Sequence, residues 1–523
     1  MLKNLPKTVI VLSIFTFSFI PFTNTIIAQS FQIEESDPFP EPEKGSLKII
    51  LLPNGNTALL HIEEKSINYR LFDSEQKMVL QRPISKGHSS SNTNLVSIFT
   101  VGSDIVLFYN ALENRTPVLY RTVIDSGSGK ILKDEEIGRL NKFKMFAGYA
   151  MAFGAVPPPN FYIRKDRNSD CYAVGLFNSF EQDRNKRIEI RHYNGKHEVI
   201  NKAFYVSPND EFKYMELVDL IVLGSEKVIA CAYVFNTSGD KVSYLSLAQL
   251  QVGSTSIQIK QLDFTEGFRI TNGILRQVPG TDMVALLGLA GVNGAFLSFL
   301  NTKTLSLEYN KTINIAGLHN EYKKIFGPKS EYHGVPLDLY VNEDGTYTLV
   351  FEEITTIYSQ HVSITSLGTT GVTIMDKDAR EIQSYIIPKL HSRTMHYGPM
   401  YMSERFDKPK GLYMGDQYKS FAYVNSSGKK YIFLNDLAEN LEHLKSGKLA
   451  TVSTVSDTDA FSFTLNDGKV DRQFMFGQPE KKCHAIGMFS VSDYDQRSGT
   501  YVTLKLDNCK DVKKIRMIWT NLK

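Results

Sequence analysis

Two stretches of similar sequence decide the fold: YVNEDGTYTLVFEE, from Tyr340 to Glu353, and YVNSSGKKYIFLN, from Tyr423 to Asn435. Each joins an apolar run, through Asn-x-x-Gly, to a second run rich in aromatic and β-branched residues, and this pattern predicts a β-hairpin. Gly345 and Gly428 fit the left-handed position that closes a three-residue loop, since glycine adopts positive φ without steric cost.

The loop length also predicts the register of the first hairpin. A three-residue loop centred on Asp344 places Val341 opposite Tyr347, Leu339 opposite Leu349 and Leu337 opposite Phe351, so that one face is continuously apolar. A two-residue loop would bring Thr348 and Glu352 onto that face, and the longer loop is therefore preferred.

Similar strand patterns recur along the chain and indicate an array of β units. They start near Lys48, Leu95, Asn160, Tyr214, Thr271, Leu337, Phe421 and Cys483. The intervals are irregular, roughly 45 to 85 residues, but most lie near the ~50 residues of a four-stranded propeller blade. We therefore predict an all-β chain, a β-propeller of seven or eight four-stranded blades. Tandem β-sandwiches, with a repeat near ~100 residues, are the alternative fold.

The longest interval between two unit starts contains an insertion at residues 388–414. Without these residues, the interval matches the spacing of the other units. Long loops on a rigid scaffold often carry function, and a mixture of aromatic, Met and Arg side chains is typical of contact surfaces. We predict a binding loop there, unless it only covers the neighbouring blade. Its candidate contact residues are His391, Arg393, His396, Tyr397, Tyr401, Glu404 and Arg405. The small apolar stretch Met145–Tyr162 is a second candidate for contact with a partner.

The N-terminus has the pattern of an export signal. Lys3 and Lys7 precede an apolar core at Val9–Ile20, and Ala28 lies near a plausible cleavage point, which predicts a signal peptide at residues 1–29. A retained anchor is the alternative. Residues 30–46 form an acidic, Pro-rich leader, expected to be an extended tether, and the propeller occupies residues 47–523. Because the last unit has only about three strands, Phe31–Glu35 could supply its fourth.

Composition limits the kinds of partner and the cellular compartment that we expect. Lys and Arg total 59 against 56 acidic residues, so no global field favours nucleic acid. The single Trp, Trp519, weighs slightly against a dedicated sugar-stacking surface. After signal cleavage no segment has the ~20 apolar residues of a membrane helix. We expect an exported protein, periplasmic or extracellular, whose partner is a protein or an envelope glycan.

The four cysteines then lie in an oxidising compartment, and four cysteines allow three pairings. We expect Cys483 to pair with Cys509 and, with less support, Cys171 with Cys231. A metal site is the alternative, but the chain has no CxxC and only His484 adjoins a cysteine. We expect neither a metal nor a cofactor.

Motifs of catalysis are missing from the sequence. It has no GxSxG, no HExxH, no P-loop and no GxGxxG followed by a helix. Asp166, Asn168 and Asp170 alternate like the start of a calcium loop, but the glycine and glutamate of an EF-hand are absent. Glu352 could offer a carboxylate to the central channel for glycoside hydrolysis, although an exposed strand end is the simpler interpretation.

Two resemblances support export. IIPK at Ile386–Lys389, followed by a long loop and YIFLNDLAEN at Tyr431–Asn440, resembles large, uncharacterised secreted propeller-like proteins of Gram-negative bacteria. That resemblance implies a fold and no reaction. The final unit, from SGTYVTLKL to KKIRMIW, is similar to the C-terminal sorting domain of type-nine secretion cargo.

Three functions from different classes therefore stay open. The first, which we favour, is a non-catalytic binding or scaffold propeller in the envelope or outside the cell. The second is a glycan-binding or glycoside-cleaving propeller. The third is cell-surface cargo of a dedicated secretion system, and this one requires the C-terminal unit to be a sorting domain.

Overall fold

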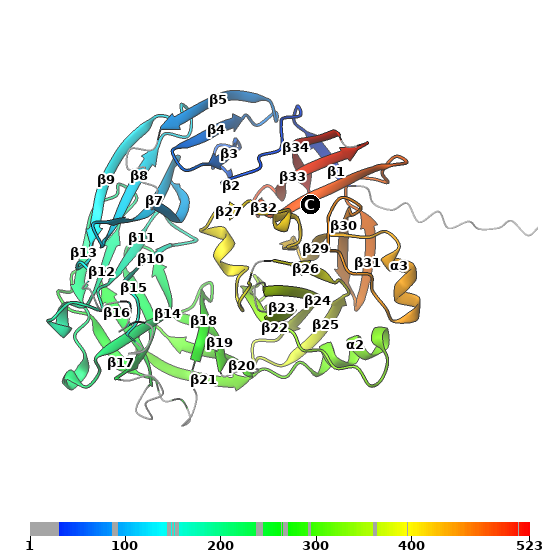
Figure 1. Cartoon of the computed structure of the whole chain (residues 1–523). Coiled ribbons are helices and arrows are strands. Elements are labelled where there is room, and N and C mark those ends of the chain that lie inside the picture. Colours follow the sequence, from blue (N-terminus) through cyan, green and yellow to red (C-terminus); the bar gives the residue numbers. More distant parts are fainter. Residues whose placement is uncertain are drawn as a thin grey trace, which may run out of the picture. The chain divides into compact units, whose positions relative to one another are not determined.

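The structure, a computed structural model, is an eight-bladed β-propeller (Figure 1). It describes residues 31–85, 93–143, 148, 151, 156–236, 244–262, 264, 270–290, 294–358, 363–394, 396–510 and 512–523. Every blade has four antiparallel strands, and the first strands of most neighbouring blades contact one another, so the first strands lie innermost. The predicted fold is confirmed, with a blade count at the upper end of the predicted range.

The first four blades follow one another without exchange of strands. Their strands are β2 (Ser46–Leu51), β3 (Thr57–Ile62), β4 (Ser66–Phe72) and β5 (Met78–Ser85) in blade 1; β6 (Thr93–Val101), β7 (Asp104–Glu113), β8 (Thr116–Ile124) and β9 (Ile131–Arg139) in blade 2; β10 (Asn160–Lys165), β11 (Tyr172–Phe177), β12 (Ile188–Tyr193) and β13 (Val199–Phe204) in blade 3; and β14 (Tyr214–Leu223), β15 (Lys227–Phe235), β16 (Tyr244–Gln251) and β17 (Gln258–Gln261) in blade 4.

The other four blades take up both ends of the chain. Their strands are β18 (Ile270–Gln277), β19 (Met283–Ala290), β20 (Gly294–Asn301) and β21 (Ser306–Thr312) in blade 5; β22 (Val335–Val341), β23 (Tyr347–Tyr358), β24 (Ser363–Met375) and β25 (Glu381–Ile387) in blade 6; β28 (Ala422–Ser426), β29 (Lys429–Asp436), β30 (Asp459–Asn466) and β31 (Lys469–Phe474) in blade 7; and β32 (Cys483–Asp495), β33 (Thr500–Cys509), β34 (Val512–Asn521) and β1 (Gln32–Glu35) in blade 8.

Helices occur only in connections among the described residues. They are α2 (Ala316–Phe326), α3 (Asn440–His443) and the short 3-10 helices η1 (Arg184–Lys186), η2 (Pro208–Asp210), η3 (Ser403–Phe406), η4 (Asp416–Tyr418) and η5 (Leu444–Ser446). In this part of the chain no helix is both long enough and apolar enough to span a membrane.

The strand pattern of the sequence located the blades well. Each predicted unit start lies within two residues of the first residue of an innermost strand, from Lys48 beside Ser46 to Cys483 itself. The clearest signal comes from the second strands, because strands such as β11 and β15 are buried along almost their whole length and are apolar throughout. Each unit start lies just before one of these runs.

The register of the first hairpin is confirmed near its turn and wrong farther away. Val341 pairs with Tyr347 and Leu339 with Leu349, and Gly345 has a φ of 79°. A bulge between Pro336 and Asp338 then shifts the ladder, so Phe351 pairs with Pro336 and not with Leu337. Bulges of this kind are common on inner strands that must bend and twist.

The second hairpin differs from the prediction in its loop. Ser426 pairs directly with Lys429, which leaves a two-residue loop in which Ser427 and Gly428 have φ of 49° and 84°. Two residues with positive φ form the turn whose twist matches that of the flanking strands. The three-residue loop predicted there is therefore wrong, although the position of the hairpin is right.

Both chain ends meet in blade 8, as the strand count predicted. β1 pairs antiparallel with β34, so Phe31–Glu35 does supply the missing strand. Beyond it the Phe39 N–H donates to the Ile515 carbonyl at 2.8 Å, and the Ser36 N–H donates to the Met517 carbonyl at 2.9 Å. The leader, expected to be an extended tether, therefore has its backbone bonded to the last strand over these residues.

Eight apolar clusters hold the ring, one at each interface between neighbouring blades. Blades 3 and 4, for example, share a cluster that contains Ile190, Met215 and Ala230, and blades 8 and 1 share one that contains Leu59 and Trp519. Each sheet therefore buries both faces against its neighbours.

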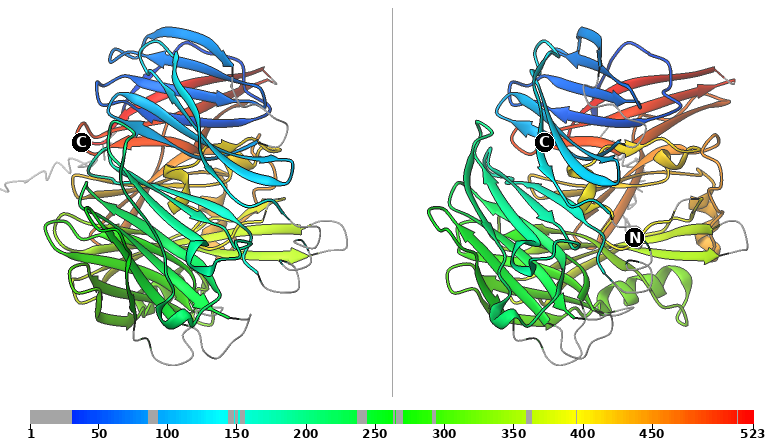
Figure 2. Two further views of the ribbon diagram at one scale, coloured as in Figure 1. Left: turned by 90° about the vertical axis from the view of Figure 1, so that its left-hand side faces the viewer. Right: turned by 60° about the vertical axis from the view of Figure 1, so that its left-hand side comes forward.

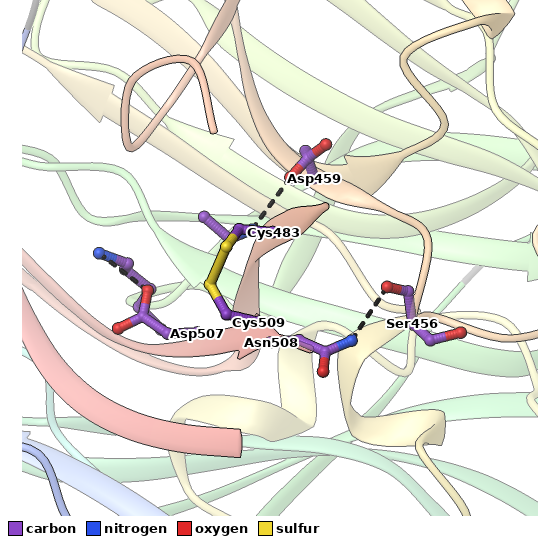
Figure 3. The surroundings of a disulfide bond; sticks show 8 residues. Ser456, Asp459, Cys483, Asp507, Asn508 and Cys509 are labelled. Atoms are coloured by element: carbon purple, nitrogen blue, oxygen red, sulfur yellow. Dashed lines mark hydrogen bonds and ion pairs between the residues drawn. A yellow bond between two sulfur atoms is a disulfide. The ribbon is translucent and has the colours of Figure 1, made fainter. Parts of the chain in front are cut away.

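One disulfide lies in the structure (Figure 3). Cys483 and Cys509 are directly opposed on β32 and β33 and form the expected bond, and the neighbouring Asn508 donates from its side chain to the Ser456 carbonyl at 3.1 Å. The expected pair of Cys171 and Cys231 is wrong, because both are free and buried. Cys171 faces the interface of blades 3 and 4, and Cys231 the interface of blades 4 and 5, so the sheet of blade 4 separates them.

Removing the closing strand is expected to destabilise the ring. A chain that begins at residue 40 loses β1 and the Phe39 bridge, and at ~1 kcal/mol per backbone hydrogen bond its free energy of unfolding should fall by about 3 kcal/mol or more. Urea unfolding of the two chains measures this difference. The control is Glu35→Gln in a chain beginning at residue 31, which loses only the exposed ion pairs to Lys505 and Arg516 and should change by at most about 1 kcal/mol. Equal stability of the short and long chains would contradict a closing role.

Candidate functional site

The insertion after blade 6 runs among the innermost strands of the ring. We call residues 388–421 the plug; it carries β26 (His391–Arg393), η3, β27 (Lys410–Gly411) and η4. In Figure 1 it is the yellow segment around β26 and β27 in the middle of the ring. β26 pairs with β24 of blade 6, and β27 pairs with β2 of blade 1, on the side away from β3.

Backbone contacts tie the plug to blades far from its own. The Ile98 N–H of blade 2 donates to the Asp407 carbonyl at 2.7 Å, and the Lys48 side chain of blade 1 donates to the Phe406 carbonyl at 2.8 Å. The Ser490 hydroxyl of blade 8 donates to the Gln417 carbonyl at 2.6 Å. The plug therefore connects blades across the centre of the ring.

Most of the predicted binding residues lie inside this plug and not on its surface. His391 and Arg393 are buried, Tyr397 and Tyr401 are partly buried, and His396 is exposed. Glu404 and Arg405 belong to η3, and their side chains lie outside the described set. The prediction placed the loop correctly, but His391 and Arg393 cannot contact a partner in this conformation.

A buried ion pair anchors the start of the plug to blade 6. The Glu352 carboxylate on β23 and the Lys389 ammonium are both fully buried and bonded to each other, and the Tyr401 hydroxyl donates to Glu352 at 2.6 Å. Lys389 also donates to the Leu367 carbonyl at 3.2 Å. Burial lowers the pKa of Lys389, while Glu352 acts in the opposite direction. The exposed strand end expected at Glu352 is therefore wrong.

A second buried network surrounds Arg393. Its guanidinium donates to the Tyr397 hydroxyl at 2.6 Å and to the Ser420 hydroxyl at 3.1 Å, and it lies 3.9 Å from the Tyr397 ring centre. The Asp416 carboxylate lies 3.7 Å from Arg393 and 3.4 Å from Lys419. Arginine presents donors in one plane, which lets it join hydroxyl, ring and carboxylate partners at once.

His391 packs between two backbone carbonyls. Its Nδ1 lies 2.7 Å from the Lys419 oxygen and its Nε2 lies 2.9 Å from the Asn435 oxygen. Burial and then the Lys389 ammonium lower the pKa of His391 to about 3, although the two carbonyls act in the opposite direction. The ring is therefore neutral near pH 7.

The calcium-like stretch is a turn. The Asp166 carboxylate is buried and accepts from the Asn168 N–H at 3.0 Å, the Ser169 hydroxyl at 2.6 Å and the Gly224 N–H at 2.9 Å. Across the described residues, no group of three or more His, Cys, Asp or Glu side chains is arranged to hold a metal ion.

Sequence reasoning missed two ion pairs that join innermost strands. Arg164 of blade 3 lies 3.1 Å from Asp219 of blade 4, and Arg276 of blade 5 lies 2.8 Å from Asp338 of blade 6. The sequence does carry a signal for these pairs. Each arginine follows an aliphatic residue, as IR in blade 3 and LR in blade 5, and each aspartate lies between two aliphatic residues, as VDL in blade 4 and LDL in blade 6. Each aspartate follows a bulge that turns it toward the preceding blade.

The two faces of the ring differ. Strand direction puts the connections between blades, and those from the second to the third strand of each blade, on one side, which we call the loop face. The other side, the turn face, has short turns such as those at Gly55, Gly345 and Gly468. The plug and α2 start from connections between blades, so they belong to the loop face, where long connections on a rigid scaffold favour binding.

One hairpin extends the loop face farther than the rest of its blade. β23 and β24 have 12 and 13 residues, whereas β22 pairs with β23 only as far as Glu352. Figure 2 shows the yellow-green pair reaching past the neighbouring strands. At its end Ile357 and Tyr358 are 66% and 74% exposed, and Ile364 is 46% exposed. The ring centre of the exposed His396 of the plug lies 6.5 Å from that of Tyr358, with the two rings tilted by 34°. The stretch Met145–Tyr162, the second predicted contact, lies mostly outside the described residues.

The buried ion pair gives a first prediction for this site. Glu352→Gln leaves the Lys389 ammonium buried without its counter-charge and should lower the free energy of unfolding by about 3–5 kcal/mol, measured in urea. The double variant Glu352→Gln with Lys389→Met should recover part of this loss. Glu343→Gln, in the exposed turn of the same blade, is the matched control and should change stability little. A small effect of Glu352→Gln would show that the pair does not hold the plug.

The buried histidine predicts how stability depends on pH. Because the pKa of His391 is about 3 in the folded chain and ~6.5 when unfolded, its contribution is complete above pH 6.5 and lost as the pH falls toward 3. The slope is ~1.4 kcal/mol per pH unit for one proton. The free energy of unfolding, measured in urea between about pH 6 and pH 4, should therefore depend on pH less steeply for His391→Gln than for the parent chain, by this amount. An unchanged slope would contradict the neutral, buried state. His192 and His197, whose pKa values are also lowered mainly by burial, add to the slope in the same direction.

Comparisons with known proteins assign no family to this chain. No family model matches this chain, and no curated protein matches it either. Among solved structures, it is similar to the Dos1 propeller (8% identity, 93% of this chain and 95% of that one, TM-score 0.43), to prolyl oligopeptidase B from Galerina marginata (8%, 90% and 56%, 0.42) and to the dihydro-heme d1 dehydrogenase NirN (7%, 92% and 75%, 0.41). The chain spans 56% of the length of a further solved structure to which it is similar, a prolyl endopeptidase. At these identities the likeness concerns the propeller architecture alone.

Proposed function

We propose that this chain is an exported, non-catalytic binding propeller that contacts a protein of the cell envelope or of the cell exterior through its loop face. The observation that carries the proposal is the extended β23–β24 hairpin with Ile357, Tyr358 and Ile364 exposed at its end. Large apolar side chains that a fold leaves in water at one projecting point are typical of protein contacts.

Export is part of the proposal and rests on the sequence of the first thirty residues. Lys3, Lys7 and the apolar core Val9–Ile20 support a signal peptide at residues 1–29. These residues lie outside the described part of the chain. The disulfide between Cys483 and Cys509 is compatible with an oxidising compartment, periplasmic or extracellular.

The buried plug supports a binding role over a glycosidase. Glu352, the carboxylate considered for sugar chemistry, is fully buried and bonded to Lys389 and Tyr401, so no substrate can reach it in this arrangement. The plug also places backbone and side chains among the innermost strands, where the substrate of a channel-mouth glycosidase would have to bind.

The position of blade 8 weighs against the third function, in which the last unit is a cleavable sorting domain. Its strands β32, β33 and β34 pair with β1 from the N-terminus, and they pack against both neighbouring blades. Removing residues after Cys483 would therefore expose two apolar interfaces.

Substitution at the hairpin end tests the proposed contact. Tyr358→Ser and Ile357→Ser should leave the thermal midpoint within about 2 °C, because both side chains are exposed, but should abolish recovery of a specific protein from envelope extract. Leu132→Ser is the matched control: Leu132 is 59% exposed on the outer strand of blade 2, away from the hairpin, and its loss should not affect recovery. If all three variants retain the same partner, the hairpin is not the contact.

A further inference from the structure

A polar groove lies on the outer rim of the turn face, far from the plug in sequence and built from other blades. It runs between β13 of blade 3 and the turn that joins β16 to β17 in blade 4, and it has a cavity volume of about 530 Å³. The side chains that matter for its chemistry are those of Arg191, Asn201, Lys202, Ser254 and Thr255. Ligand pockets in proteins commonly have volumes of about 300–1,000 Å³, so this groove is large enough for a small-molecule ligand.

The charged side chains that line this groove are both cations. The Arg191 guanidinium is already engaged, since it lies 2.6 Å from the Glu189 carboxylate and also donates to the Ile137 carbonyl. Lys202 is exposed, and among the residues that the structure describes its ammonium forms no ion pair. The groove therefore offers one cationic donor that a negatively charged ligand could neutralise.

The backbone of β13 is not available for pairing with an added strand at this point. The Asn201 side-chain oxygen accepts from the Lys202 N–H at 3.0 Å, and the Asn201 amide nitrogen donates to the Gln251 carbonyl of blade 4. A peptide adding to a sheet edge needs such backbone groups unoccupied. Asn201 thus weighs against an extended peptide as the occupant.

The rest of the lining suits a hydroxyl-rich ligand. Thr255 is exposed beside Ser254, whose hydroxyl donates to the Ser256 carbonyl at 2.7 Å and can still accept from a ligand. Val199 offers an apolar surface that is 46% exposed at the other side of the groove. The hydroxyl groups of a sugar ring need hydrogen-bonding partners, and the C–H face of the ring needs a small apolar contact. The opening is wide, which allows the ligand to continue as a chain beyond the groove.

We propose that this rim groove binds a carboxylated polysaccharide, with a uronate carboxylate at Lys202 and the sugar hydroxyls against Thr255 and Ser254. Such a site lies on the face opposite to the β23–β24 hairpin. The protein would then attach to an acidic glycan by its turn face while its loop face stays open to a protein partner.

Calorimetric titration of the full mature chain with a short oligogalacturonate tests this proposal. The chain should bind the oligogalacturonate and not a neutral glucan oligomer of equal length, and binding should weaken as salt rises. Lys202→Gln should weaken it roughly fivefold, the effect of one exposed charge pair. Asn201→Asp, which adds a negative charge, should weaken it further.

Controls separate this site from the other surfaces. Lys77→Gln removes an exposed lysine from a turn of blade 1 on the same face and should leave binding unchanged, as should Tyr358→Ser at the hairpin. The proposal is overturned if the chain does not bind oligogalacturonate, if Lys202→Gln binds as tightly as the parent chain, or if poly-glutamate of equal charge binds as tightly as the oligogalacturonate.

Discussion

Every blade of this protein is apolar on both faces, and that constraint determines the rest of the structure. A sheet of four short strands cannot bury two faces alone, so each must pack against a neighbour on either side. Among the described residues, eight separate apolar clusters meet this requirement, and each joins two successive blades. Only a closed ring leaves no blade with an exposed apolar face. In this protein blade 8 packs against blade 1, and the pairing of β1 with β34 completes blade 8.

A closed ring of eight blades brings its innermost strands around a central space, and the plug lies in that space. Buried charges inside it are tolerated because each has partners, as with Lys389 and Glu352 or Arg393 and Asp416. A buried ion pair contributes little net stability, but breaking it is costly, so it specifies one position for the segment that carries it. The plug is thereby fixed among the innermost strands, where it contacts blades 1, 2, 6 and 8.

The sequence predicted repeating architecture far better than it predicted the site. Blade starts such as Asn160 and Cys483 could be predicted because runs of aromatic, β-branched and other apolar residues recur between turns, a signal that neighbours in sequence provide. The role of His391 and Arg393 depended on partners far away, Asn435 and Asp416, which no local pattern reveals. A mixture of Arg, Tyr and Met is typical of contact surfaces and of buried polar networks alike.

The same limit explains the cysteines and the second hairpin loop. Cys171 and Cys231 are near enough in sequence to suggest a bond, but the sheet of blade 4 lies between the two interfaces that they face. At Gly428 the Asn-x-x-Gly pattern was read as in the first hairpin. The side-chain pattern allowed both loop lengths, and the twist of the strands determined which one formed.

The pairing of β1 with β34 also fixes an order of events during synthesis. β1 is the first strand to be made and β34 the last, so the contacts that join them have to wait for almost the whole polypeptide. Until then the chain is an open arc, and the apolar sides of its first and last sheets remain uncovered. A protein built in this way benefits from a helper, or from a separate compartment, that keeps the unfinished arc from aggregating until its ends can meet.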